Sequence, residues 1–273
     1  MKEFFGIGGY SREPEGFMSW QHLLFVSTLM LIMVALSVYL GIRNKKRDEK
    51  TKNKVLIYAA LLIDGFELFK IILMCSTSDE PMGAFLRTLP LFLCSIQLIT
   101  IPLAAFSSGR LKESALDFVL IFGILGAVLG TYGAGQNYNA YPVLSFDNVV
   151  SGITHSISGF SSLYIAVSGM ASMKRKNIYI TVLILSFFCI CAYTANVLIP
   201  YNYMFLMSGD GTPYDIFYNM VNGHPVLYPM IVVVLFFVYI AVFYGIFLAI
   251  RKNKKKRASA TVEDTHKAEA LST

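Results

Sequence analysis

A cysteine and a histidine within apolar stretches are the groups of this sequence best suited to chemistry. Cys94 lies in the stretch 87–107 and His155 in the stretch 147–172. A cysteine attacks as the thiolate, which apolar surroundings disfavour unless a base is adjacent. An imidazole supplies that base, and later an acid for the leaving group, as in Cys–His acyl-transfer sites. If the two stretches are neighbouring helices, Cys94 and His155 form a candidate catalytic pair.

Each member of the pair also has a purely structural interpretation. A lone cysteine in an apolar helix is typically a small packing residue, and a histidine there can hydrogen-bond to a neighbouring helix. It is the combination of the two that favours the catalytic interpretation.

Other polar side chains in the apolar stretches are candidates for substrate binding or support. Glu67 and Lys70 are spaced i, i+3 and can neutralise each other on one helix face, with Asp64 one turn away. Asp117 is expected to interact with a helix dipole or to reach the membrane interface. Side-chain amides could donate hydrogen bonds to a developing oxyanion. The amides in suitable positions belong to Gln97, Asn196 and Asn202.

The connection 202–225 mixes Asn and Asp with Tyr and Phe and contains no Lys or Arg. This composition is typical of an aromatic belt at the membrane interface. Alternatively, the connection forms a cap, including Asn202 and Tyr203, that admits a lipid and excludes water.

The composition indicates an integral membrane protein. Of the 273 residues, 55% are apolar and 15% charged, and the mean hydropathy is +0.58. Soluble domains typically carry about 25% charged residues. The balance excludes an ordinary soluble enzyme, a disordered chain and a nucleic-acid-binding protein. The 4 cysteines are too few for a secreted disulfide scaffold.

The apolar segments predict an all-α, polytopic bundle of seven transmembrane helices, since about 20 residues are needed to cross the hydrocarbon. The Ser- and Gly-rich composition of the fifth span favours close packing at the centre of the bundle. The predicted spans are residues 20–42, 55–75, 87–107, 115–133, 147–172, 178–200 and 226–250.

The basic residues predict how the bundle is oriented. They concentrate in the connection 43–54, in the connections after the third and fifth spans, and in the tail 251–273. By the positive-inside rule, the N-terminus lies outside and the C-terminus in the cytoplasm. The predicted organisation is an extracellular segment 1–19, a seven-helix transmembrane domain 20–250, and a basic cytoplasmic tail whose composition is typical of disorder.

In this orientation the polar side chains share one depth. At 1.5 Å per residue from the outer ends of their spans, Cys94 lies roughly 10 Å inside and His155 roughly 12 Å inside. Glu67 and Lys70 fall in the same layer. The predicted site therefore opens toward the outer leaflet.

Three short motifs resemble a known family. Residues 89–94, Leu-Pro-Leu-Phe-Leu-Cys, resemble the Leu-Pro-Leu-His-Leu-Cys signature of the YwaF-type family of bacterial seven-helix membrane proteins, which is similar to eukaryotic transmembrane protein 164. The two further motifs follow in the same order and extend the resemblance to the last span. They are Thr154-His155, and Asn-Tyr-Met-Phe-Leu at 202–206 followed by Gly-His-Pro at 223–225 and Tyr228. One position departs from the signature, because Phe92 replaces its histidine.

The resemblance implies an activity. The eukaryotic relatives are lipid acyltransferases that act on phospholipids through a membrane cysteine and histidine, and these roles fall on Cys94 and His155. We therefore expect an acyltransferase or transacylase in the bacterial cell membrane, forming a thioester on Cys94, with a phospholipid or lysophospholipid as partner. No cofactor, metal or nucleic acid is expected, because the sequence contains neither clustered metal ligands nor a nucleotide-binding motif.

A function from a different class stays open. Asp64, Glu67 and Lys70 could carry coupling protons or hold a polar headgroup in a small-molecule transporter or lipid-binding protein. Such a protein would be sensitive to replacement of Glu67 and indifferent to replacement of Cys94, whereas an enzyme would show the opposite order.

Overall fold

The computed structural model describes the backbone of residues 3–271 and the side chains of residues 3–253. The described residues form helices and turns and contain no strand. The α-helices are α1 (Trp20–Asn44), α2 (Glu49–Thr77), α3 (Pro81–Leu86), α4 (Gln97–Phe106), α5 (Gly109–Tyr132), α6 (Gly135–Ala140), α7 (Phe146–Ser168), α8 (Ile178–Leu198), α9 (Asp215–Met220) and α10 (Leu227–Leu271), and the 3₁₀ turns are η1 (Arg175–Asn177) and η2 (Tyr203–Phe205).

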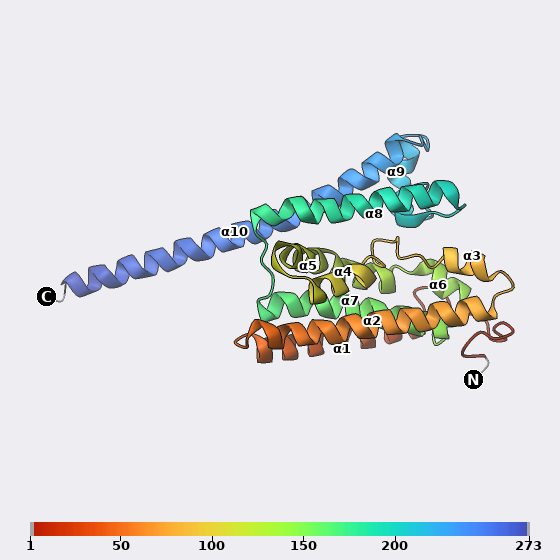
Figure 1. Ribbon diagram of the computed structural model, residues 1–273, viewed down its shortest axis with the longest axis horizontal. Coiled ribbons are helices and arrows are strands. Elements are labelled where there is room, and N and C mark those ends of the chain that lie inside the picture. The colour runs from red at the N-terminus through yellow and green to blue at the C-terminus, as the bar shows by residue number, and fades with distance from the viewer. Residues whose placement is uncertain (1–2, 272–273) are drawn as a thin grey trace.

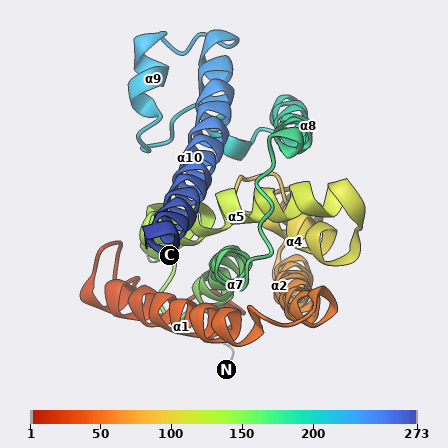
Figure 2. The same ribbon diagram turned by 90° about the vertical axis from the view of Figure 1, so that its left-hand side faces the viewer.

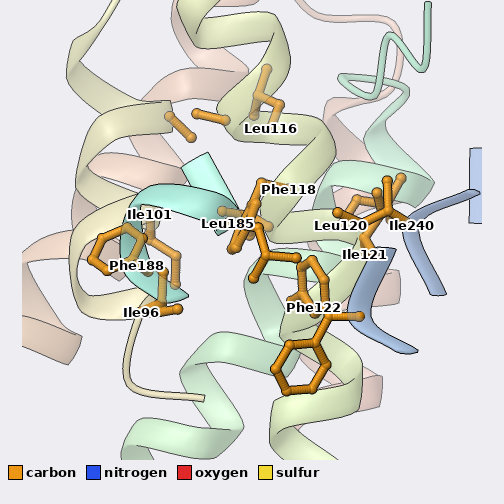
Figure 3. Close-up of a cluster of buried hydrophobic side chains, with 14 of the residues drawn as sticks. Ile96, Ile101, Leu116, Phe118, Leu120, Ile121, Phe122, Leu185, Phe188 and Ile240 are labelled. Carbon is orange, nitrogen blue, oxygen red and sulfur yellow. The ribbon is translucent and has the colours of Figure 1, made fainter. Parts of the chain in front are cut away.

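The long helices are arranged in layers with α5 in the middle. Figure 2 shows α4 and α5 between α1, α2 and α7 on one side and α8 and α10 on the other. The contacts agree, because α5 packs against both α7 and α8, and α4 packs against α2 and α5. An apolar cluster fills the space between α4, α5, α8 and α10 (Figure 3); it includes Ile101, Phe118, Phe122, Leu185, Phe188 and Ile240.

The two ends of the molecule differ. The N-terminal segment and the short helices α3, α6 and α9 lie at one end, and the C-terminus lies at the other (Figure 1). Basic connections meet at the end that holds the C-terminus. There Arg110 donates a hydrogen bond to the Lys176 carbonyl, and Lys112 Nζ donates to Asn53 Oδ1 at 2.6 Å.

Within the described residues, four helical segments are long and apolar enough to cross a membrane. They are Trp20–Asn44, Gly109–Ala140, Arg175–Leu198 and Leu227–Asn253. Their surfaces expose large apolar side chains such as Leu31, Phe187 and Val234. Exposed apolar faces of this extent mark a membrane or protein interface, and together with the length of the helices they identify an integral membrane protein.

Two further predicted spans form long helices of lower hydropathy. Helix α2 covers the predicted span 55–75, and α7 covers the predicted span 147–172 as far as Ser168. Charged side chains within α2 and the Ser and Gly residues of α7 lower their apolar character. As expected for a helix rich in small residues, α7 packs closely between α1, α2 and α5.

The predicted helix over 87–107 is wrong in its first half. Residues 87–96 form turns and bends, and α4 covers only Gln97–Phe106. Pro90 explains the difference, because proline lacks an N–H and disfavours helical backbone in the preceding residue. Cys94 therefore lies in a turn leading into α4 and not on a helix above Gln97.

The backbone of the basic tail is helical over its described residues. Its backbone over residues 251–271 continues α10 and extends beyond the other helices (Figure 1). These residues include no Gly or Pro and many Lys, Ala and Glu. Their high helix propensity accounts for the continued helix.

Asp117 is buried, although from the sequence we expected it to reach the membrane interface or to interact with a helix dipole. Its carboxylate accepts hydrogen bonds from the backbone N–H groups of Ser172 (3.1 Å) and Met173 (2.9 Å), from Asn177 Nδ2 (3.1 Å) and from the Tyr244 hydroxyl (3.0 Å). The side chain of Asp117 is fully buried. It therefore ties α5 to the connection before α8 and to α10.

Replacing Asp117 by alanine is expected to lower the free energy of unfolding by about 3 kcal/mol, because several buried donors lose their acceptor. Thermal unfolding of the purified protein in detergent measures the effect. Glu113→Ala is the matched control, since Glu113 lies one turn earlier on α5 and pairs with Lys174 at the surface (2.6 Å). Such a pair contributes at most about 1 kcal/mol, so equal losses in both variants would contradict the assigned role.

Candidate active site

A cavity of about 1030 Å³ lies at the end of the molecule that holds the N-terminal segment. Residues from α2, α5, α7, the turn before α4 and the connection after α8 line it. Ligand cavities for small molecules usually measure about 300–1,000 Å³. The space is therefore large enough for a substantial part of a lipid.

Cys94 and His155 both line this cavity, although they come from different elements. Cys94 lies in the turn before α4, and His155 lies in the middle of α7. Both also line a second, smaller cavity of about 60 Å³.

Two glycines on consecutive turns of α5 make room for these side chains. A Cβ atom at Gly126 would lie 3.4 Å from the Cα and Cβ atoms of Cys94. A Cβ atom at Gly130 would overlap the imidazole of His155. Residues four apart lie on one helix face. The face of α5 with Gly126 and Gly130 therefore has no side chains at these positions, which lets Cys94 and His155 pack against its backbone.

The backbone of α7 determines which nitrogen of His155 is available as a base. Nδ1 of His155 lies 2.7 Å from the backbone carbonyl oxygen of Ser151. A carbonyl oxygen only accepts, so Nδ1 carries the proton and donates it. Nε2 is then the unprotonated nitrogen in the neutral ring.

Glu67 and Lys70 lie beside the pair and line both cavities. Lys70 Nζ and Glu67 Oε1 are 3.1 Å apart, and the two side chains are only 18% and 14% exposed. The two residues therefore neutralise each other, as their spacing predicts. Asp64 lies outside the lining of both cavities.

Gln97 and Asn196 do not line either cavity, which corrects the prediction that they donate to an oxyanion. Gln97 is fully buried, and its Oε1 accepts a hydrogen bond from Thr100 Oγ1 at 3.1 Å. Asn196 binds the backbone of Tyr203, donating from Nδ2 to the carbonyl (2.9 Å) and accepting at Oδ1 from the N–H (2.7 Å). A shared depth does not predict which amides face Cys94, and the helix face predicted to join Gln97 to Cys94 does not form, because residues 87–96 are not helical.

Asn202 and Tyr203 stabilise the connection after α8 from outside the cavity lining. Asn202 Nδ2 donates to the Ser208 carbonyl (2.8 Å), and its Oδ1 accepts from the Met207 N–H (2.8 Å). The Tyr203 hydroxyl donates to the Leu86 carbonyl. Other residues of the connection do line the cavity; these are Tyr201, Met204, Phe205, Asp210, Gly211, Thr212 and Tyr214.

Backbone amides beside the thiol are donors that the sequence did not reveal. Within the described part of the chain, the N–H groups of Leu93, Cys94 and Ser95 form no hydrogen bond with protein atoms. They lie in the turn before α4 that the hydrogen bond from the Ile96 N–H to the Phe92 carbonyl closes (3.0 Å). The first N–H groups of a helical turn have no partner within it and readily bind anionic oxygen. Cys94 and Ser95 line both cavities.

The N-terminal segment lines part of the cavity, which the sequence also did not reveal. Phe5 and Tyr10 line the cavity, and the Phe4 carbonyl accepts a hydrogen bond from the Phe146 N–H at 2.9 Å. Burial, reinforced by the negative charge of Asp147, raises the pKa of Tyr10 to about 12. The phenol therefore stays protonated at neutral pH and donates to Asp147 Oδ2 (3.4 Å).

The sequence model of the TMEM164 family matches residues 17–247, from the start of α1 to well along α10. The chain belongs to the TMEM164 family. The resemblance to transmembrane protein 164 predicted from the short motifs is thus confirmed. No curated protein and no solved structure matches the chain.

In this TMEM164-family protein, the residue that departs from the signature has its own packing role. The ring of Phe92 lies against Tyr201, Tyr203 and Phe205, with centroid distances of 6.0, 5.2 and 6.0 Å. Phe92 also lines the large cavity. Its apolar ring forms part of the cavity wall.

Proposed function

We propose that this TMEM164-family protein is a membrane phospholipid acyltransferase or transacylase that uses Cys94 as nucleophile and His155 as general base. The observation that carries the proposal is the placement of a thiol and an imidazole on the wall of one lipid-sized cavity. Membership of the TMEM164 family agrees with this assignment.

The proposed reaction has two steps through one covalent intermediate. The Cys94 thiolate attacks the ester carbonyl carbon of a phospholipid, a C–S bond forms, and the ester C–O bond breaks. The proton held by His155 passes to the departing oxygen of the lysophospholipid. In the second step the hydroxyl of a lysophospholipid acceptor gives its proton to His155 and attacks the thioester, and Cys94 leaves as the thiolate.

The negative charge that develops on the carbonyl oxygen needs hydrogen-bond donors. The N–H groups of Leu93, Cys94 and Ser95, which form no backbone hydrogen bond, adjoin the nucleophile along the chain and can supply these donors. We assign them the role first predicted for the side-chain amides of Gln97, Asn196 and Asn202. Glu67 and Lys70 are assigned to binding the polar part of the lipid, because both line the cavity.

The proposed topology places this site on the outer side of the bacterial cell membrane. The chain would cross seven times, with α2, α7 and the segment containing α4 as the less apolar crossings. The opposite positions of the two termini (Figure 1) support an odd number of crossings. The basic connections at the end of the C-terminus then face the cytoplasm.

The direct test uses the purified protein in lipid nanodiscs. A phospholipid with an isotopically labelled acyl chain is the donor, and a lysophospholipid is the acceptor. We expect a labelled diacyl product and a protein-bound acyl label that hydroxylamine removes. The absence of both would contradict the proposal.

Gly130→Ala is expected to lower the rate of acyl transfer by about 10- to 100-fold, because small displacements of a catalytic group have effects of this size. The added methyl group would overlap the His155 ring and displace it from Cys94. Initial rates in the nanodisc assay measure the effect. Gly245→Ala is the control, since a Cβ atom there meets no atom within 4 Å; equal activity of both variants would contradict the proposed position of the base.

A further inference from the structure

The smaller of the two cavities adjoins the proposed catalytic pair from the side of α2 and α7. It measures about 60 Å³, and its lining shares several residues with that of the large cavity. The shared residues are Glu67, Lys70, Cys94, Ser95, Ser151 and His155. The two spaces therefore meet at the thiol and the imidazole.

The size of this cavity limits what it can hold. A cavity needs about 10–15 Å³ of probe-occupied volume for each water molecule, whereas cavities for small molecules start at about 300 Å³. The small cavity is thus suited to a few water molecules and excludes the glycerol backbone of a lysophospholipid.

The lining is polar enough to hold water. A buried water typically needs two to four hydrogen-bonding partners, roughly three on average. Among the described residues, the hydrogen-bonding partner of the Ser95 hydroxyl is Cys94 Sγ, at 4.0 Å. The hydroxyls of Thr154 and Ser158 donate to backbone carbonyls, which leaves their lone pairs free to accept. Lys70 and Glu67 add a charged donor and a charged acceptor.

We infer that the small cavity binds the water that hydrolyses the acyl-enzyme, so that this protein also acts as a phospholipid acyl hydrolase when no acyl acceptor is present. The inference rests on the proposed function, because it starts from the thioester on Cys94. Water attacks the thioester carbonyl carbon and gives a proton to His155 Nε2. The C–S bond breaks, a fatty acid is released, and His155 returns the proton to the Cys94 thiolate. The sum is phospholipid plus water giving lysophospholipid plus fatty acid.

Filling the small cavity tests the inference. Ile63 and Leu98 line the small cavity and not the large one, so Ile63→Phe and Leu98→Phe each reduce its volume without narrowing the other space. Leu73→Phe is the matched control, because Leu73 also lies on α2 but lines only the large cavity. Thermal unfolding identifies any variant that fails to fold, and the second filling variant then replaces it.

The measurement is made without acceptor, in nanodiscs of phosphatidylcholine, phosphatidylethanolamine and phosphatidylglycerol with labelled acyl chains, in water enriched in ¹⁸O. We expect the wild-type protein to release fatty acid with one ¹⁸O in its carboxyl group, and Cys94→Ala to release none. In Ile63→Phe, fatty acid release should fall about tenfold or more relative to acylation of Cys94, because the attacking water is displaced, and the acyl-enzyme should accumulate. In Leu73→Phe, acylation and release should change together.

The outcomes separate this inference from the proposed function. If Cys94 becomes acylated but the thioester stays intact without acceptor, the hydrolytic activity is refuted and the acyltransferase stands. An unchanged ratio of release to acylation in both filling variants refutes the small cavity as the water site. If Cys94 is never acylated, the proposed function fails, and the inference fails with it.

Discussion

Cys94→Ala is expected to reduce acyl transfer to background, a loss of at least about 10³-fold, because removal of a covalent nucleophile eliminates the pathway and not one contact within it. The hydroxylamine-sensitive acyl label should disappear with the activity. The labelled diacyl product and the protein-bound label are measured in the same nanodisc samples. Full activity without the thiol would contradict the proposed function.

Two kinds of control make this result specific. Cys189→Ala removes a buried thiol that contacts Met204 Sδ (3.9 Å) and lines neither cavity, so its activity should stay near that of the wild type. Glu67→Gln separates an enzyme from the alternative function, a small-molecule transporter. An enzyme loses more activity in Cys94→Ala than in Glu67→Gln, and a transporter that depends on Glu67 shows the reverse order.

His155→Gln is expected to lower the rate of acyl transfer by about 10²–10⁴-fold, which is the usual contribution of a general acid–base. In the wild-type protein the Ser151 carbonyl accepts a hydrogen bond from His155 Nδ1 (2.7 Å), and the glutamine amide of the variant can still donate to it. The variant thus keeps a structural contact and loses the base. Alkylation of Cys94 by iodoacetamide should slow in parallel, because less of the thiol is present as thiolate.

His22→Gln is the matched control for this variant. His22 is also fully buried, and its Nε2 lies 3.1 Å from the Thr131 carbonyl, but it lines neither cavity. We expect lower thermal stability with nearly unchanged activity per folded molecule. If His22→Gln and His155→Gln lose activity equally, the effect is structural, and the role of His155 as base is wrong.

The sequence by itself determined the membrane character, the family and the candidate pair. Long apolar runs require burial in lipid or protein wherever they lie, so the helices α1, α5, α8 and α10 could be predicted from composition along the chain. The motif around Cys94 indicated the family that the match over residues 17–247 confirms. Cys94 and His155 could be selected together because each lies a similar number of residues from the outer end of a predicted span.

Only the tertiary structure decided which side chains surround that pair. The break at residues 87–96 moved Cys94 off the helix of Gln97, so depth no longer predicted a shared face. The burial of Asp117 and the cover formed by Tyr10 depend on partners 55 to 137 residues away. Such contacts arise from the packing of helices against one another. Local propensity does not predict them, because a hydrogen bond between distant segments forms only where the tertiary structure brings its donor and acceptor together.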